Sequence, residues 1–204
     1  MGKADLNIFQ KNVPSSTEKL QNSAVGIAGC GGLGSNAAVA LVRAGIGKLI
    51  LIDSDSVEES NLNRQFFFQT DIGKEKVTAL ANHLKNINPN VTLDTLHIKL
   101  EPNNIKPLFK DADLLIEAFD KAEEKHWLIE SWCKSFPHKP IICASGLSGI
   151  GKTERLKVKH AGQIYICGDE ESDMSIGLCS ARVAIVANMQ ANVAIEILTS
   201  SKGK

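Results

Sequence analysis

The residues of this chain that can do chemistry begin with a glycine-rich turn. Gly29, Gly31 and Gly34 follow the G-x-G-x-x-G spacing directly after the apolar run of residues 25–28. The first glycine can turn without a Cβ clash, the second lets a phosphate approach the backbone, and the third lets a helix pack closely on the strand. A helix starting here would point free N–H groups at an anion. The turn therefore predicts a nucleotide site.

A carboxylate lies where such a site needs one. Asp53 follows the apolar run of residues 49–52, and an acid at the end of this second strand is placed to bind ribose hydroxyls. The glycine pattern alone is weak. With a strand before it, a helix after it and Asp53 downstream, nucleotide binding is a stronger interpretation than a purely structural turn. The kind of nucleotide stays open at this point.

Residues 54–72 are rich in polar side chains and contain three consecutive phenylalanines, Phe66–Phe68. One interpretation is a short helix anchored by the aromatic rings, and the other is a polar rim above the nucleotide. Lys76 lies in the first turn of a helix predicted over residues 73–88. A lysine there opposes the helix dipole, which favours a ligand-binding role.

Asp120 has both a structural and a functional interpretation. It follows a buried strand predicted over residues 113–119, and its spacing to Glu123 is typical of a capping box that starts the next helix. The carboxyl end of a strand is also where open α/β sheets bind ligands, so Asp120 can alternatively hold magnesium.

Residues 146–153 match the phosphate-loop pattern G-x-x-x-x-G-K-[ST]. A true phosphate loop opens a helix. Polar and apolar residues alternate over residues 155–159, and Gly162 then provides a turn. This pattern instead predicts a hairpin with its second strand over residues 163–167. We therefore interpret Lys152 as lying outside the nucleotide site.

Length and composition narrow the class of protein. The chain has 204 residues and no net charge at pH 7, which suits one α/β domain and gives no support for a nucleic-acid or anionic membrane surface. No apolar run approaches the ~20 residues of a membrane span, and the first residues have no apolar signal core, so we expect a cytoplasmic protein. No C-x-x-C pair occurs, so we expect no zinc, and the odd number and scattered spacing of the cysteines argue against a disulfide framework. The five cysteines are Cys30, Cys133, Cys143, Cys167 and Cys179.

The order of apolar runs predicts an α/β fold with a Rossmann-like sheet. Its first half should be parallel with helices on both faces, and its second half should add antiparallel strands. The helix over residues 181–198 has so narrow a polar stripe that we expect it to be buried nearly all round. The acidic stretch 168–173 is typical of a solvated loop. We expect residues 1–23 to form an N-terminal arm and residues 24–204 a single nucleotide-binding domain.

Four blocks of sequence resemble the ThiF/MoeB/HesA branch of the ubiquitin-activating-enzyme superfamily. The likeness covers about residues 24–199 and is greatest to the short ThiF proteins of thiamine synthesis. It implies an adenylyltransferase that uses ATP and magnesium on the C-terminal glycine of a small ubiquitin-like sulfur carrier. The carrier would be ThiS-like or the small subunit of molybdopterin synthase, and the enzyme a homodimer. The blocks are residues 29–36, 53–57, 60–65 and 72–77.

The resemblance also implies roles for individual residues. Asp53 would bind the ribose hydroxyls and Asp120 the magnesium ion. Arg64, Lys76 and Asp120 would be catalytic. The full set expected around ATP is Gly29, Gly31, Gly32, Gly34, Asp53, Asp55, Asn61, Arg64, Gln65 and Lys76.

The chain departs from this family in three respects. The N-terminal arginine finger given across a dimer has no counterpart, because the first arginine is Arg43 and only Lys11 or Lys19 can substitute. The paired C-x-x-C zinc knuckles of many relatives are absent. The segment that carries a sulfur-handling cysteine is short. Cys179, just before the last helix, is the candidate for that thiol, with a small apolar residue at a helix start as the alternative.

Other functions stay open. A NAD-dependent oxidoreductase suits the glycine turn and Asp53, but it leaves Asn61, Arg64 and Lys76 without a role and little chain for a substrate domain. A non-catalytic relative that binds nucleotide or carrier suits the missing arginine finger. A phosphate-loop ATPase is the weakest alternative, because its motif lacks the following helix.

Overall fold

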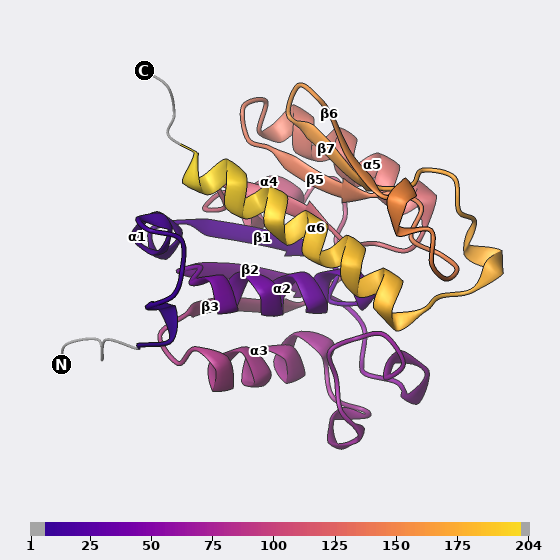
Figure 1. Ribbon diagram of the computed structural model, residues 1–204, viewed down its shortest axis with the longest axis horizontal. Coiled ribbons are helices and arrows are strands. Elements are labelled where there is room, and N and C mark those ends of the chain that lie inside the picture. Colours follow the sequence, from indigo (N-terminus) through magenta and orange to yellow (C-terminus); the bar gives the residue numbers. More distant parts are fainter. Residues whose placement is uncertain (1–6, 201–204) are drawn as a thin grey trace.

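In the computed structural model, residues 7–200 are described, except for the side chains of Asn7 and Met174, and they form a seven-stranded sheet flanked by helices (Figure 1). The first six residues of the predicted arm lie outside this range. The strands are β1 (Ala24–Ala28), β2 (Lys48–Asp53), β3 (Thr92–His97), β4 (Leu114–Glu117), β5 (Ile141–Ala144), β6 (Lys157–Ala161) and β7 (Ile164–Gly168). The helices are α1 (Ser16–Gln21), α2 (Gly32–Ala44), α3 (Lys76–Ile87), α4 (Ile105–Leu108), α5 (Ala122–Ser135) and α6 (Ser180–Thr199).

The sheet has the predicted Rossmann-like character. Its strand order is β3-β2-β1-β4-β5-β7-β6. All neighbouring strands are parallel except β6 and β7, which form the predicted antiparallel hairpin. The antiparallel part of the second half is thus confined to this hairpin, because β5 pairs with β7 in parallel. The order reverses at β1 and β4, and such a switch point opens a crevice at the carboxyl ends of the strands.

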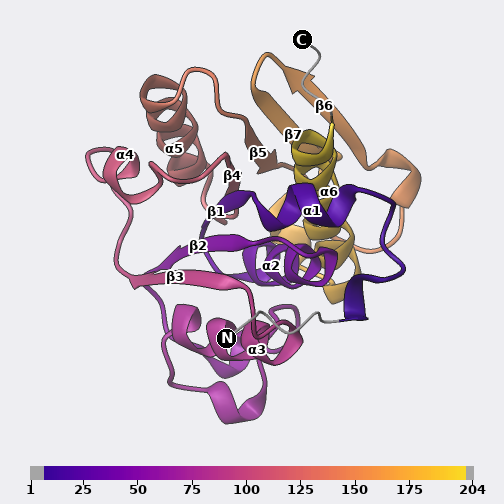
Figure 2. The same cartoon turned by 90° about the vertical axis from the view of Figure 1, so that its left-hand side faces the viewer.

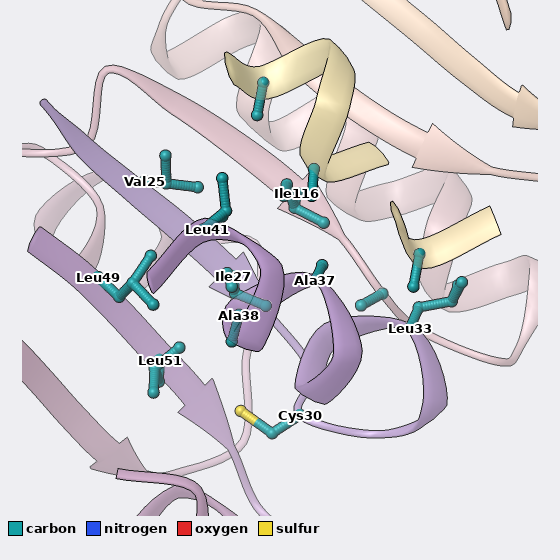
Figure 3. Close-up of a cluster of buried hydrophobic side chains, with 14 of the residues drawn as sticks. Val25, Ile27, Cys30, Leu33, Ala37, Ala38, Leu41, Leu49, Leu51 and Ile116 are labelled. Atoms are coloured by element: carbon teal, nitrogen blue, oxygen red, sulfur yellow. The ribbon is translucent and has the colours of Figure 1, made fainter. Parts of the chain in front are cut away.

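Side chains of β2 show how helices cover both faces. Leu49 and Leu51 pack in a cluster with α2, α3 and α6, whereas Ile50 and Ile52 pack in a second cluster with α5. All four are at most 2% exposed. Figure 2 shows α4 and α5 on the opposite side of the sheet from α2 and α6, and Figure 3 shows the first cluster between α2, β1 and β2. The predicted double coverage is confirmed.

Gly34 lies where α2 contacts the turn after β1. A Cβ at this position would overlap the carbonyl oxygen of Gly29, which is a backbone atom that cannot turn away. We expect Gly34→Ala to lower the free energy of unfolding by about 3 kcal/mol or more, measured by urea denaturation. At Gly31 a Cβ would come no closer than 3.7 Å to Gln65 Nε2. Gly31→Ala should therefore cost far less, and equal losses from the two substitutions would contradict this account.

The last helix differs from its prediction. α6 packs one face on α2 and the sheet, where Val186 and Ala187 are fully buried, but Ile185 is 38% exposed and Asn188 and Asn192 are exposed. Burial nearly all round is therefore wrong, because Ile185, Asn188, Asn192 and Glu196 form a stripe of this helix that faces solvent. Among the described helices, α6 is long and apolar enough to span a membrane by length and composition alone. Its apolar face is occupied by the core.

The described part of the N-terminal arm packs at the end of the sheet opposite the carboxyl edge. Asn12 Nδ2 donates to Ala44 O at 2.9 Å, and Leu20 is 1% exposed. Lys19 Nζ donates to Thr199 O at 2.5 Å, so its charge stabilises the C-terminal end of α6. Lys19 therefore points away from the crevice of its own chain, and Lys11 is an exposed residue. The division into an arm and one domain stays a prediction.

Candidate nucleotide-binding site

A cavity of about 670 Å³ opens at the carboxyl ends of β1, β2, β4 and β5. It collects most of the predicted site residues, although they are far apart in the chain. Three of them, Gly34, Asn61 and Cys179, do not line it. Those that do are Gly29, Gly31, Gly32, Asp53, Asp55, Arg64, Gln65, Lys76 and Asp120.

The glycine turn has the predicted geometry. Gly29 has a φ of +94°, which few residues other than glycine adopt, and its N–H donates to Ile52 O at 2.9 Å. α2 begins at Gly32, and its N-cap residue Gly31 supplies no side-chain cap. The first N–H groups of α2 are therefore available to an anion in the cavity. Figure 3 shows this turn leading from β1 into α2, with Cys30 at its start.

Asp53 ends β2 and braces the glycine turn. One carboxylate oxygen accepts the N–H of Cys30 at 2.6 Å, and the other accepts the N–H of Asp55 at 2.7 Å. Burial raises the pKa of Asp53, while these two N–H groups oppose the shift. Each carboxylate oxygen can accept more than one hydrogen bond, so Asp53 can still accept bonds from ribose hydroxyls.

Lys76 is the first residue of α3 and is buried beside the cavity. Its Nζ lies 2.8 Å from Asp55 Oδ2. The lysine side chain is 8% exposed, whereas the aspartate side chain is 64% exposed. A nearly buried ammonium group with a solvated partner can exchange that partner for a phosphate that carries more charge. Its predicted place in the first helical turn is confirmed.

Residues 54–75 hold Arg64 over the cavity. Arg64 Nη1 donates to Ser60 O at 3.0 Å and to Asn63 Oδ1 at 2.7 Å. Asn36 Nδ2 of α2 donates to Arg64 O at 3.0 Å, and Ser35 Oγ accepts the N–H of Phe66 at 2.9 Å. α2 therefore fixes this segment at two consecutive points. The segment contains two short 3-10 turns rather than the single short helix of the structural interpretation.

The segment is also fastened to α3. His83 Nε2 lies 2.6 Å from the buried Asp71, and the Phe68 ring packs edge-on against His83 with centroids 4.9 Å apart. Burial alone would raise the pKa of Asp71, but hydrogen bonds from Phe68 N–H, His83 and Lys74 lower it overall. The folded structure thus stabilises the ionised form of Asp71.

Asn61 is placed differently from what the resemblance implies. Its Oδ1 accepts the N–H of Glu58 at 3.0 Å and closes the turn Glu59–Asn61. The residue is 7% exposed and lies outside the residues that line the cavity. Its amide therefore stabilises the segment that carries Arg64.

Asp120 is an exposed residue on the cavity wall between β4 and α5. The capping box with Glu123 is wrong, because Lys121 is the N-cap residue of α5 and no side chain caps this helix. The chain stays extended through Lys121, with φ −91° and ψ 129°, and so carries Asp120 past the helix start. Within residues 7–200, no hydrogen bond or ion pair holds its carboxylate, which can therefore meet a ligand in the cavity.

The donor set suits magnesium that is shared with a nucleotide. Magnesium typically binds one or two carboxylates together with substrate phosphates, and Asp120 supplies such a carboxylate. Among the described residues, no three His, Cys, Asp or Glu side chains gather as a metal site of their own.

A buried ion pair behind Asp120 was missed by the sequence analysis. Both carboxylate oxygens of Glu117 lie 2.9 Å from Lys125 Nζ, and Glu117 is fully buried. Burial raises the pKa of Glu117, opposed chiefly by Lys125. Gln190 Nε2 of α6 donates to Glu117 O at 2.9 Å and to Ile142 O at 3.1 Å, where β4 and β5 diverge. An acid within the apolar run Leu114–Ala118 was the signal available in the sequence.

Two further predictions concern residues near the cavity. Lys152 is exposed, and the chain after it forms a 3-10 turn and β6 rather than a helix, so the phosphate-loop interpretation is excluded as predicted. Cys179 is the N-cap residue of α6, is partly exposed, and follows Leu178 of the cavity wall. Cys143 and Cys167 are buried, and burial raises the pKa of Cys167 to about 12 and that of Cys143 further, which disfavours their thiolate forms.

A glycine turn at a helix start, a carboxylate ending the second strand and cations over one crevice define a nucleotide-binding protein of the Rossmann-like α/β class. Comparison with known families agrees with this geometry. The chain matches the ThiF family over residues 4–204 and belongs to that family.

Curated relatives share the sequence over most of this chain. The chain is 31% identical over 199 residues to the adenylyltransferase and sulfurtransferase uba4 of Emericella nidulans, covering 90% of this chain and 41% of the relative. It is 29% identical over 194 residues to the adenylyltransferase and sulfurtransferase MOCS3 of Anopheles gambiae, covering 91% of this chain and 43% of the relative. The chain thus spans about two fifths of the length of these relatives.

Solved structures share the fold. The tRNA N6-threonylcarbamoyladenosine dehydratase TcdA of E. coli superimposes with a TM-score of 0.82 at 20% identity, covering 90% of this chain and 88% of TcdA. E. coli MccB with ATP gives a TM-score of 0.72 at 22% identity, covering 90% of this chain and 58% of MccB. At these identities the likeness supports the architecture alone.

Proposed function

We propose that this protein is an adenylyltransferase that uses ATP and magnesium to activate the C-terminal glycine of a small ubiquitin-like sulfur carrier. The observation that carries the proposal is the meeting of Asp53, Arg64, Lys76 and Asp120 around one cavity. Membership of the ThiF family and relatives that are named adenylyltransferases support the same reaction.

The reaction balances without a further reactant. A carboxylate oxygen of the carrier forms a bond to the α-phosphorus of ATP, the bond between that phosphorus and the β-phosphate oxygen breaks, and pyrophosphate leaves. The barrier comes from repulsion between two anions and from charge that builds on the leaving group. Positioning and electrostatic stabilisation are therefore what the protein must supply.

The residues of the cavity can supply both. Asp53 accepts the ribose hydroxyls, and the N–H groups at the start of α2 face the phosphates. Lys76 leaves Asp55 for a phosphate oxygen, and Arg64 adds a second positive charge. Asp120 would hold magnesium, which would supply positive charge to the phosphates.

The carrier belongs on the other side of the cavity. Ile150 and Ile176 are 83% and 63% exposed and lie in the two loops whose residues Leu147, Ser148 and Leu178 line the cavity. Exposed apolar side chains beside a cavity mouth are typical of a protein-binding surface. A protein that inserts only its terminal residues would contact them with its folded body.

Pathway and assembly are part of the proposal. We assign the carrier to the ThiS type of thiamine biosynthesis, with the molybdopterin-synthase small subunit as the alternative.

A homodimer is supported by the exposed Ile185 on α6, and a cytoplasmic location by the free cysteines of the described chain. Cys179 is a candidate sulfur-handling thiol.

Carrier-dependent exchange of labelled pyrophosphate into ATP tests this function. We expect exchange with a purified ThiS-type carrier, less with the molybdopterin-synthase subunit, and none with the ThiS-type carrier shortened by its terminal glycine. Titration with oxidised and reduced nicotinamide cofactors tests the alternative enzyme class. Binding of a nicotinamide cofactor without any exchange would refute the proposal.

A further inference from the structure

The acidic stretch after β7 is largely exposed, as the sequence predicts, except for the side chain of its first acid, Asp169. Asp169 Oδ2 lies 2.5 Å from Arg182 Nη2, and the two side chains are only 6% and 4% exposed. Arg182 stands in the first turn of α6 and also donates through Nη1 to the carbonyl oxygens of Gly151 and Lys152. One guanidinium group therefore joins three segments that are separate in the sequence.

Asp169 organises the chain that follows it. Its Oδ1 accepts the N–H of Glu171 at 2.9 Å and the N–H of Ser172 at 2.8 Å. Burial alone would raise the pKa of Asp169, but these bonds and Arg182 lower it overall. The ionised carboxylate thus folds the start of the β7–α6 segment, which we define as residues 169–179.

The β7–α6 segment is joined to the β5 loop, which we define as residues 145–152. Backbone bonds run from Asp169 N to Gly146 O at 3.0 Å and from Gly149 N to Gly177 O at 2.8 Å. Ser148 N also donates to Ser172 Oγ at 3.1 Å. The joined segments line one part of the cavity wall and contribute no residue to the predicted ATP set.

We propose that the Asp169–Arg182 pair positions the second substrate by holding the two joined segments as the surface on which the carrier's C-terminal residues lie. This inference rests on the proposed function. In that reaction, residues 29–76 account for ribose and phosphates, and the joined segments carry the strongly exposed Ile150 and Ile176 beside the cavity, so we place the path of the attacking carboxylate along them. The pair touches neither reactant and is a positioning pair.

Burying the charges of Asp169 and Arg182 costs desolvation free energy, which favours a positioning role for the pair over a contribution to folding stability alone. Two charges that lose their water gain little stability over apolar side chains of similar size, but they fix direction through their hydrogen bonds. Arg155 and Glu171 form a second ion pair nearby, 3.5 Å apart and more than half exposed. Water screens that pair, so it cannot fix the wall in the same way.

The test compares two double variants, because removing one buried charge alone would strand the other. Asp169→Asn with Arg182→Met removes the buried pair, and Arg155→Met with Glu171→Gln removes the exposed pair as the matched control. For each protein we would measure urea stability, ATP affinity by calorimetry, and the KM of a ThiS-type carrier in pyrophosphate exchange. Arg182→Lys keeps the charge but not the planar fork whose two ends reach Asp169 and the β5 loop.

We expect the buried-pair variant to raise the carrier KM about tenfold or more while ATP affinity and kcat change less than about twofold. The exposed-pair variant should match the wild type, and Arg182→Lys should give an intermediate carrier KM. An unchanged carrier KM, or an equal loss of ATP affinity, would overturn the inference while leaving the proposed function intact. If the wild-type protein catalysed pyrophosphate exchange with none of the carriers, both the proposed function and this inference would be refuted.

Discussion

Replacement of Lys76 by alanine is expected to lower carrier-dependent pyrophosphate exchange by about a thousandfold or more, which corresponds to about 4 kcal/mol of lost transition-state stabilisation. The reason is its position. Lys76 is nearly buried at the cavity, and its only ion-pair partner among the described residues is the solvated Asp55. A phosphate entering the cavity would meet this ammonium group in an environment that water screens poorly.

The fold should tolerate this change. The partner left behind, Asp55, is 64% exposed and recovers its water. Lys74→Ala is the matched control, because Lys74 is also in an ion pair of the same segment, with Asp71, but is 51% exposed and does not line the cavity. If the Lys76 variant exchanged pyrophosphate at more than about a tenth of the wild-type rate, Lys76 would have no major role in the reaction.

Replacement of Asp120 by alanine should have an effect of similar size, about a thousandfold in exchange rate. Without this carboxylate, magnesium would be held by the nucleotide alone and would no longer be fixed over the leaving pyrophosphate. Asp120→Asn should show a smaller defect that higher magnesium concentrations partly restore. Exchange rates measured over a magnesium series would reveal this difference.

Glu124→Gln provides the control for Asp120. Glu124 lines the same cavity from the first turn of α5, and its nearest cation is Lys121 at 3.6 Å. If its removal reduced exchange as much as removal of Asp120, the effect would come from general negative charge and the magnesium assignment would be wrong. Because no side chain caps α5, neither change should disturb the helix start.

Local patterns predicted the nucleotide side of the cavity well, because it is built from local geometry. Gly29 turns at positive φ, α2 begins directly after the turn, and Asp53 ends β2, as their spacing indicates. The same holds for the β6–β7 hairpin, where alternation correctly outweighed a phosphate-loop pattern that matched letter for letter. Each of these features depends on a few neighbouring residues and on backbone rules.

Features that depend on distant partners could not be read in the same way. A capping box at Asp120 and Glu123 is decided by where the chain leaves β4, and this lies outside the motif. Asp169 belongs to an acidic run that composition marks as solvated, and only Arg182, 13 residues later, buries it. Glu117 and Lys125 likewise pair across the turn from strand to helix. The available signal in all three places was a charge next to apolar sequence.

The two sides of the cavity are encoded in separate stretches of the chain. Residues 29–76, together with Asp120, form the side that meets ATP, whereas residues 145–183 contain the joined segments and the Asp169–Arg182 pair. Changes in residues 145–183 can therefore alter which carboxylic acid is activated, while the use of ATP is kept. A chimera that exchanges only residues 145–183 between relatives should transfer the choice of acid and leave nucleotide use as it was.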